Sequence, residues 1–341
     1  MTAPLAQLLM VTVLAASGAG AAKEEICISL TKRLFVHDPQ EVVISQSELI
    51  GDEIGRRMGR KVTVIYGGDT TAGIVEDLRS GRAQFVFSNA LDFVRLRMGR
   101  IAPGAVVPPM DVRPLVAVGV VTDSEDLAGC TRSMVVTRKD AGVRTFGDLR
   151  NRRFVYSVDS EGDCTMVFLG SLVRKEGYDG AAEFFGQPAP RRLDCYDTCL
   201  LSLQSGSADA ACIPELTFLA KQMVHGGELK YVEHLAKSDH HTAYLCFYLA
   251  DKVPPGLAEE LRYELLRAHD TERLARLLKQ INVERFVPVD AANLAPIEAM
   301  LEQAEPDKEG TEPAGVRASP AQATGGARAP DARAGATAVP H

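Results

Sequence analysis

The stretch Leu78-Arg-Ser-Gly-Arg-Ala-Gln-Phe-Val-Phe-Ser-Asn-Ala-Leu-Asp-Phe93 occurs a second time, in altered form, as Leu203-Gln-Ser-Gly-Ser-Ala-Asp-Ala-Ala-Cys-Ile-Pro-Glu-Leu-Thr-Phe218. Leu, Ser, Gly, Ala, Leu and Phe recur at the same offsets in the two copies, which lie about 125 residues apart. Each copy predicts the end of a helix, a glycine just after it, and then a short buried strand. One unit used twice predicts two lobes of similar design. The alternative is a chance likeness between two α/β segments.

Around the first copy, short apolar runs alternate with amphipathic stretches. Such alternation is typical of an α/β fold, and it predicts largely parallel sheets. The expected strands of this region are Ile26–Val36, Val62–Tyr66 and Ala83–Phe87, and the expected helices are Val42–Met58 and Thr71–Arg79.

The segment 243–301 has no partner in the second copy, and we expect it to return and complete the first lobe. It contains an expected strand, Thr242–Leu249, and two expected helices, Leu257–Leu266 and Thr271–Gln280. Lobe 1 is then predicted to comprise residues 23–118 plus 243–302, and lobe 2 residues 119–242. The chain would cross between the lobes twice, near Leu115–Val121 and near the strand that begins at Thr242. Two crossings form a hinge, and a hinge between two α/β lobes forms a cleft.

The two ends of the chain differ from the body. Residues 1–22 read as a secretory signal peptide, because Leu5–Ala16 is an uncharged apolar run and Ala19 and Ala21 have the spacing of a cleavage site. An uncleaved membrane anchor is the alternative. Either way, we expect the body to lie in the periplasm, where disulfides are permitted. Residues 303–341 are rich in Pro, Ala, Gly and Thr without apolar periodicity, so we predict a disordered tail.

Composition and motifs exclude several classes of function. The net charge of −7 is mild and no basic stripe is present, so we expect no nucleic-acid partner. No Gly-x-Ser-x-Gly, phosphate-binding loop or His-Glu-x-x-His motif occurs, and we predict that the protein is not an enzyme and needs no cofactor. A catalytic set assembled from Cys164, His37 and Asp197 has no support from their spacing.

Several segments, in order, resemble the PhnD-like family of periplasmic receptors for phosphonate, phosphite and phosphate, which have the type-2 periplasmic binding fold. These segments are Val75–Asn89, Arg144–Tyr156, Leu203–Ala211 and the closing region Lys252–Asp290, and the resemblance covers roughly Ile26 to Leu301. The resemblance implies two α/β lobes joined by a two-crossing hinge. It also implies a receptor that hands a small solute to an ABC importer, or a sensor receptor of the same build.

Ligands of open parallel sheets bind beyond the carboxyl ends of strands, where helix N-termini offer free N–H groups. This rule, together with the resemblance, selects candidate ligand-binding residues from both lobes: His37, Thr70, Thr71, Ser88, Asn89, Ser160, Asp163, Cys164, Thr165, Cys195, Tyr196 and Asp197. No metal site is predicted.

The loop before the expected helix Val167–Lys175 departs from the family pattern. The resemblance implies a Ser-Thr-Ser-Gly run here whose hydroxyls and amides hold phosphonate oxygens, but this chain has Asp163-Cys164-Thr165-Met166. A carboxylate 4 Å from a bound anion repels it by about 4 kcal/mol at an effective dielectric of 20. The alternative is that Asp163 caps the helix and points away from the ligand.

Seven cysteines leave three interpretations open. Cys164 lies at an expected helix N-terminus, Cys195 and Cys212 end the expected strands Arg191–Cys195 and Ala208–Cys212, and Cys199 follows one helical turn after Cys195. Three or four of these thiols could therefore face one cleft and bind a thiophilic solute such as arsenite. Cys164 with Cys195, or Cys195 with Cys199, could instead form disulfides, which an oxidising compartment favours. Buried free thiols are the third interpretation. For His240-His241 a metal site is conceivable, and a solvated loop is the commoner arrangement.

We therefore predict the receptor of an ABC importer for a small oxyanion of the phosphonate, phosphite or phosphate type. The alternative is a sensory receptor for arsenite or another thiophilic solute that signals to a sensor kinase. A scaffold that has lost ligand binding is a third class. The expected partners are the solute and a permease or kinase in the inner membrane, and we expect a monomer.

Overall fold

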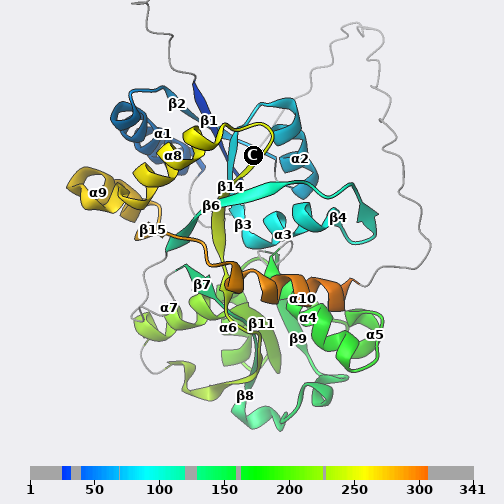
Figure 1. The fold of residues 1–341 in the computed structure, drawn as a ribbon. Helices are drawn as coiled ribbons and strands as arrows, with labels where there is room; N and C mark the ends of the chain where they lie inside the picture. The colour runs from blue at the N-terminus through cyan, green and yellow to red at the C-terminus, as the bar shows by residue number, and fades with distance from the viewer. Residues whose placement is uncertain are drawn as a thin grey trace, which may run out of the picture.

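The computed structural model describes residues 25–31, 40–68, 70–119, 129–158, 163–225 and 228–305, apart from the side chains of 40, 220, 223–225 and 228. Two lobes, each built around one sheet, lie one above the other in Figure 1. The predicted α/β fold with two lobes is confirmed.

The sheet of the first lobe has the order β15-β6-β14-β3-β1-β2. Its strands are β1 (Ile26–Leu30), β2 (Val62–Tyr66), β3 (Phe85–Asn89), β6 (Val112–Gly119), β14 (Tyr244–Leu249) and β15 (Arg285–Val287). One face is covered by α1 (Gln40–Met58), α8 (Pro255–Leu266) and α9 (Glu272–Gln280), and the other by α2 (Thr71–Ser80) and α3 (Ala90–Met98). A small hairpin, β4 (Arg100–Ala102) with β5 (Ala105–Val106), follows α3.

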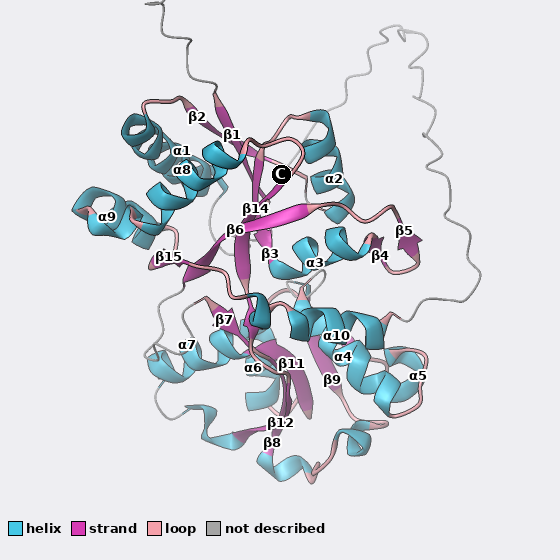
Figure 2. Ribbon diagram, viewed as in Figure 1, coloured by secondary structure: helices cyan, strands magenta, loops and turns pink. Residues whose placement is uncertain are grey.

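The sheet of the second lobe has the order β10-β9-β11-β8-β12. Its strands are β8 (Ser133–Arg138), β9 (Phe154–Ser157), β10 (Arg191–Leu193), β11 (Ala210–Pro214) and β12 (Val232–Lys237). Helices α4 (Cys164–Lys175) and α5 (Ala181–Phe185) pack on one face, and α6 (Tyr196–Gln204) and α7 (Glu215–His225) on the other. In β8, Met134 and Val136 face the α6 side while Val135 faces the α4 side, as the two-residue period of a strand requires. Figure 2 shows this helix–strand–helix layering in both lobes.

The repeated sequence unit is also a repeated structural unit. In the first lobe it is α2, β3 and the start of α3, and in the second lobe it is α6, β11 and the start of α7. The three elements begin at residues 71, 85 and 90 in one copy and at 196, 210 and 215 in the other. Gly81 and Gly206 have φ of 75° and 70°, which a residue with a Cβ rarely adopts, so glycine is needed at this turn.

The expectation of largely parallel sheets is wrong. Strands β1, β2 and β3 are parallel, as are β9, β10 and β11, but β14, β6, β15, β8 and β12 all pair antiparallel to their neighbours. The reason is the crossings. Both β8 and β14 begin at the boundary between the lobes and run away from it, whereas the parallel strands end there.

The hinge contains a short ladder of its own. Strand β7 (Cys130–Thr131) lies between β6 and β8 along the chain, and β13 (His241–Thr242) lies between β12 and β14. They pair antiparallel, with His241 opposite Thr131 and Thr242 opposite Cys130. The two crossings of the predicted hinge are therefore hydrogen-bonded to each other.

A third connection was not predicted. After β15 the chain leads to α10 (Ala295–Ala304), which packs on α4 of the second lobe and on α3 of the first. Figure 1 shows α10 lying between these two helices. Its N-cap Leu294 and its buried residues Ile297, Met300 and Leu301 belong to one apolar core that includes residues of both sheets. The lobe boundaries 23–118 plus 243–302 and 119–242 remain a proposal.

The remaining predicted elements differ mainly in their ends. The strand expected at Ala83–Phe87 is shifted two residues toward the C-terminus, to Phe85–Asn89. The strand expected at Ile26–Val36 is confirmed over Ile26–Leu30, and residues 32–39 lie outside the described part of the chain. The predicted signal peptide and tail fall outside it as well, apart from residues 303–305 at the end of α10, where a disordered tail was expected.

Candidate functional site

In the first lobe, the strand ends that face the second lobe lead directly into helices. Thr70 is the N-cap of α2, and its side chain accepts a hydrogen bond of 3.1 Å from Gly73 N. Asn89 is the N-cap of α3, and its side-chain oxygen accepts one of 2.9 Å from Asp92 N. Two predicted site residues thus serve as caps of α2 and α3, whose positive ends lie where the preceding strands end.

The turn before α2 packs closely against side chains of β1 and α2. A Cβ on Gly67 would lie 1.8 Å from Ser29 Oγ, so a larger residue does not fit there. The buried carboxylate of Asp77, on α2, accepts a hydrogen bond of 3.1 Å from Gly68 N. This amide, which lies two residues before the candidate ligand residue Thr70, is therefore bonded within the lobe.

Thr71 and Ser88, two further predicted residues, converge on a carboxylate that sequence reasoning missed. Asp92 is fully buried, accepts a hydrogen bond of 2.6 Å from Thr71 Oγ1, and accepts a short one from Ser88 Oγ. The Ser88 hydroxyl also lies 3.2 Å from that of Thr31. The sequence signal was the spacing Asn89-x-x-Asp92, in which cap and acid share the first turn of one helix.

In the second lobe, Asp163 is the N-cap of α4. Its carboxylate accepts hydrogen bonds of 2.7 Å from Thr165 N and 2.6 Å from the Tyr196 hydroxyl. Loss of hydration raises the pKa of Asp163 to about 6, although both hydrogen bonds oppose the shift. Because the carboxylate occupies amides at the start of α4, it sits where an anionic ligand would bind a helix N-terminus.

Tyr196 and Cys164 connect Asp163 to the first lobe. Burial raises the pKa of the Tyr196 hydroxyl well above its usual range, and Asp163 and the nearby Tyr244 of β14 add to the shift. Burial also raises the pKa of the Cys164 thiol, and the carboxylates of Asp163 and Asp92 raise it further. The Cys164 thiol is therefore within electrostatic reach of carboxylates from both lobes.

The connection through β14 is direct. Tyr244 pairs with Asn89 in the β14–β3 ladder, and Ala90 N donates a hydrogen bond of 2.9 Å to Ala243 O. The N-terminus of α3 and the second crossing of the hinge are thus fixed to each other. Sequence reasoning did not select Tyr244, because its position at the hinge gave it no strand-end signal.

The structure places the remaining predicted residues in different surroundings. Cys195 caps α6 and its Sγ lies 3.7 Å from Thr198 Oγ1, while Asp197 is exposed and forms an ion pair of 2.6 Å with Lys221. Thr165 is buried beside Asp163. His37 and Ser160 fall outside the described residues.

All seven cysteines are free, so neither predicted disulfide is present. Cys199 is buried inside α6, and Cys212 is buried within β11, which continues to Pro214. Cys212 Sγ donates to Thr165 O at 3.5 Å, and burial raises the pKa of this thiol well above its usual range. Protonated, buried thiols are poor ligands for a thiophilic solute.

The described residues contain no group of three or more His, Cys, Asp and Glu side chains arranged for a metal ion. The interpretation of His240-His241 as a solvated loop is wrong for His241. It is buried in the hinge ladder, with Nε2 3.4 Å from Ser133 Oγ, because β13 pairs with β7.

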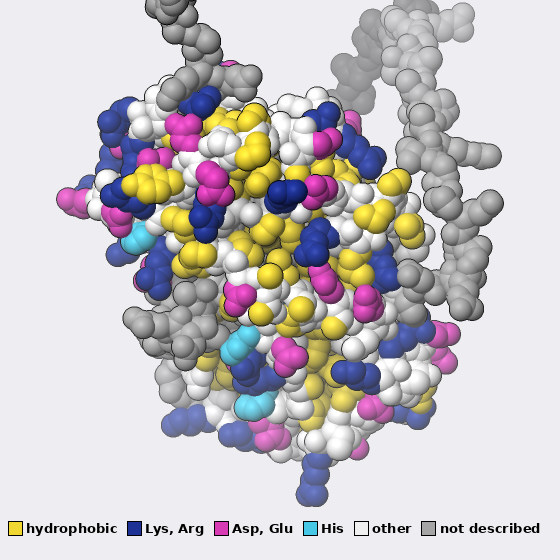
Figure 3. All heavy atoms as spheres, in the orientation of Figure 1, with side chains coloured by type: hydrophobic (Ala, Val, Ile, Leu, Met, Phe, Trp, Pro, Cys, Tyr) yellow, Lys and Arg dark blue, Asp and Glu magenta, His cyan; other side chains and the backbone are white. Residues whose placement is uncertain are grey.

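On the face drawn in Figure 3, basic and acidic side chains are interspersed over both lobes. No helix in the described ranges is long and apolar enough to span a membrane.

Comparison with protein families adds a decisive observation. The family described as the periplasmic substrate-binding protein of phosphonate ABC transporters matches residues 36–294. The chain belongs to this family. The resemblance inferred from the sequence is thereby confirmed, and the chain is the periplasmic substrate-binding component of an ABC transporter of the phosphonate type. Proteins of this class bind a small solute and deliver it to a permease. No curated protein matches the chain.

Solved structures share the fold. XAC2383 from Xanthomonas citri, bound to chloride ion, has a TM-score of 0.62 at 13% identity, over 82% of this chain and 98% of that one. PhnD1 from Prochlorococcus marinus, in complex with methylphosphonate, has a TM-score of 0.53 at 16% identity, over 81% and 96%. A phosphonate-transporter binding protein from Pseudomonas aeruginosa has a TM-score of 0.54 at 11% identity, over 81% and 85%. At these identities the likeness shows that this receptor has their fold.

Proposed function

We propose that the receptor binds a small phosphorus oxyanion, of the phosphonate, phosphite or phosphate type, between its lobes. The helices α2, α3, α4 and α6 all begin at strand ends that face the boundary between the lobes. Helix N-termini stabilise negative charge, since their first amides have no partner within the helix. A solved relative in complex with methylphosphonate supports this ligand class.

The observation that carries the proposal is the cap of α4. Asp163 occupies the amides of the first turn with its own carboxylate, and its pKa lies near 6. A charged carboxylate repels an incoming anion, whereas a protonated one donates a hydrogen bond to it. We therefore propose that the oxyanion competes with the Asp163 carboxylate for α4, and that protonation of Asp163 favours the ligand.

Affinity should accordingly rise as pH falls. Binding of methylphosphonate, measured by calorimetry between pH 5.5 and 7.5, should tighten by at most about tenfold per pH unit above pH 6. Asp163→Asn keeps a good N-cap and removes the charge, so it should bind more tightly at pH 7.5. Titration of the ligand itself affects both proteins equally, so the difference between them isolates Asp163. If the wild type and Asp163→Asn bind methylphosphonate with equal affinity and equal pH dependence, Asp163 is not part of the binding site.

A thermal-shift titration identifies the ligand class. Phosphate, phosphite, methylphosphonate and arsenite are each tested with and without a reductant. A ligand at 100 times its Kd stabilises the folded state by about 2.7 kcal/mol, which is a shift of several degrees. A shift with a phosphorus oxyanion, independent of reductant, supports the proposal. A shift with arsenite alone would support a sensory receptor for a thiophilic solute instead.

Three further expectations belong to this proposal. Residues 1–22 act as an export signal, the receptor is a monomer, and the lobe boundaries are those predicted from the sequence. Closure then brings α2 and α3 toward α4 and α6 about the β7–β13 ladder, and the permease recognises the closed receptor. Mass spectrometry of the exported protein, with light scattering, tests the first two.

A further inference from the structure

A pocket of about 430 Å³ lies in the second lobe, between α7, the short helix Glu228–Tyr231 and strand β12. Its volume falls in the range typical of small-molecule sites. The ten residues around it are Lys139, Glu215, Phe218, Leu219, Gln222, Leu229, Lys230, Val232, His234 and Lys237. None of them belongs to the interlobe cluster of Asp163, Tyr196 and Asp92.

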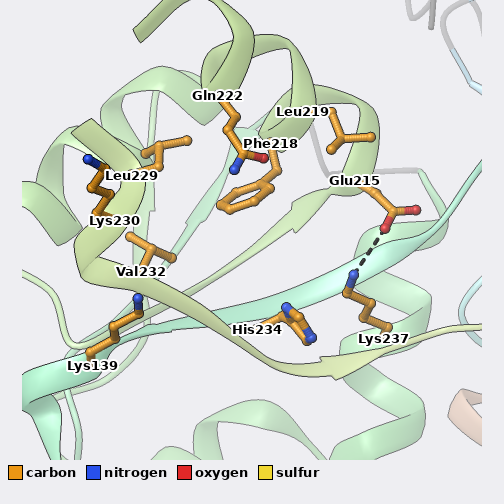
Figure 4. Close-up of a pocket in the computed structure, with 10 residues that line it drawn as sticks. All are labelled: Lys139, Glu215, Phe218, Leu219, Gln222, Leu229, Lys230, Val232, His234 and Lys237. Atoms are coloured by element: carbon orange, nitrogen blue, oxygen red, sulfur yellow. Dashed lines mark hydrogen bonds and ion pairs between the residues drawn. The ribbon is translucent and has the colours of Figure 1, made fainter. Parts of the chain in front are cut away.

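The floor of the pocket is apolar. Val232 is buried in the core of this lobe, and Phe218 and Leu229 pack partly buried against the same core. Figure 4 shows Phe218 at the centre, with Leu229 and Val232 beside it toward one end. Side chains held in this way present a preformed apolar surface to a ring or a short chain.

The charges around the pocket are unequal. The lining contains three lysines and one acidic residue, Glu215. The Glu215 carboxylate forms ion pairs with Lys237 at 3.1 Å and with Arg132 at 3.8 Å. Lys139 and Lys230 have no ion-pair partner among the side chains that the structure describes. Figure 4 shows both at the same end, opposite the Glu215–Lys237 pair.

The cationic end is also the end remote from the hinge. Lys139 follows the last residue of β8, and β8 begins at the hinge with Ser133. Val232, at the start of β12, pairs with Arg138, while Lys237 pairs with Met134 near the hinge. A ligand anchored at Lys139 and Lys230 would thus bind away from the boundary between the lobes.

We propose that this pocket is a second ligand site, for a small organic anion with an apolar body. The anionic group, a carboxylate, phosphate or sulfonate, pairs with Lys139 and Lys230. The apolar body lies on Phe218, Leu229 and Val232. Methylphosphonate, the test ligand of the proposed interlobe site, carries only a methyl group in place of such a body, so it should not occupy this pocket.

The probe for this site is 1-anilinonaphthalene-8-sulfonate, a sulfonate on an apolar ring system whose fluorescence rises on burial. Lys139→Ala/Lys230→Ala replaces two exposed side chains, so the fold should persist. It should weaken probe binding about tenfold, or about 1.4 kcal/mol. The matched control is Lys252→Ala/Lys279→Ala, which removes the same charge from exposed positions elsewhere and should leave the affinity unchanged.

Competition separates the two sites. Phenyl phosphate, an anion with an apolar ring, should displace the probe, and methylphosphonate should not. Probe binding that is equal in both double variants and the wild type would overturn the proposal. Displacement by methylphosphonate would overturn it too, because the probe would then occupy the interlobe site. Failure of the proposed transport ligand leaves the comparison of the two double variants unaffected, since that comparison uses neither Asp163 nor methylphosphonate.

Discussion

Asp163 carries the one strongly shifted carboxyl pKa among the described residues, and it does so at a helix N-cap, where acids are usually ionised. Desolvation outweighs the hydrogen bonds from Tyr196 and Thr165, so the folded protein holds the Asp163 proton up to a pH of about 6. Under the proposed function, the same residue links the stability of the lobe to its affinity for anions.

The free energy of unfolding should show this link. Because the pKa of Asp163 is higher in the folded protein than in the unfolded chain, the protonated carboxyl stabilises the fold. This stabilisation is complete below the pKa of the unfolded chain, 3.8, and is lost as pH rises through about 6. The free energy of unfolding should fall by about 2 kcal/mol over this range, which is less than the full pKa shift implies, because the Asp163 side chain is partly exposed to solvent. Urea unfolding between pH 4.5 and 7.5 should show that Asp163→Asn gains stability relative to the wild type as pH rises. Parallel curves would contradict the assignment.

His241 should make the free energy of unfolding depend on pH in the opposite direction. Burial lowers its pKa to about 4, so the folded protein keeps the imidazole neutral in the hinge ladder. The stabilisation is complete above the unfolded pKa, 6.5, and is lost as pH falls through about 4. The loss should be about 3 kcal/mol.

The test is His241→Gln, which keeps a side-chain amide near Ser133 Oγ and has no titrating group. It should unfold with less dependence on acid than the wild type, in urea titrations between pH 7 and 4.5. His269→Gln is the control, because His269 is exposed in the first lobe. If both variants follow the wild-type curve, the hinge histidine does not govern acid stability.

At the scale of elements, α10 is the feature that ties the two lobes together most directly. Its body packs on α4, and its last turn is held to the first lobe, where the Arg95 guanidinium forms a two-pronged ion pair with Glu305. Arg100 Nη1 donates a further hydrogen bond of 2.8 Å to Glu305 O. The Arg95 and Glu305 side chains are 8% and 17% exposed, so this pair is largely desolvated.

Removing one partner of a desolvated pair leaves the other charge without compensation. Glu305→Gln should therefore lower the free energy of unfolding by about 3 kcal/mol. The neighbouring Arg97–Glu298 pair joins the same helices but is 46% and 34% exposed, so Glu298→Gln should cost less than about 1 kcal/mol. Urea unfolding of the two variants checks the difference. Equal costs would show that burial of the Arg95 pair adds nothing.

At the scale of the whole molecule, one apolar core joins the two lobes. One apolar core contains Val86 and Leu245 from the first sheet, Val135 and Phe154 from the second, and the buried face of α10. Lobes that share a core in this way lose stability together when the core is disrupted.

Unfolding should therefore show one transition. Hydrogen-exchange mass spectrometry in urea follows β3 and β11 separately, and both should lose protection at the same midpoint. Leu301 of α10 is fully buried in the shared core, so Leu301→Ala should lower both midpoints, by about 2 to 5 kcal/mol in stability. Separate midpoints in the wild type would mean that the lobes are independent.

The sequence by itself determined the class of fold, the two lobes, the family and the positions of most elements. These follow from local patterns: the repeated Leu-x-Ser-Gly unit requires a glycine with positive φ in each copy, and apolar periodicity assigns helix and strand. Such signals depend on neighbours along the chain, so they can be read without the fold.

Tertiary structure decided the rest, because contacts between distant residues leave no local signal. The sequence found Asp163, but packing against Tyr196 made it a group with a pKa near 6. Thr71 and Ser88 were chosen as ligand groups, and the fold bonds them to Asp92. Cysteines near strand ends remained free thiols, since the spacing along the chain does not fix which Sγ atoms meet. The place of α10 between the lobes, and the lysine-rimmed pocket beside β12, arise from segments far apart in sequence.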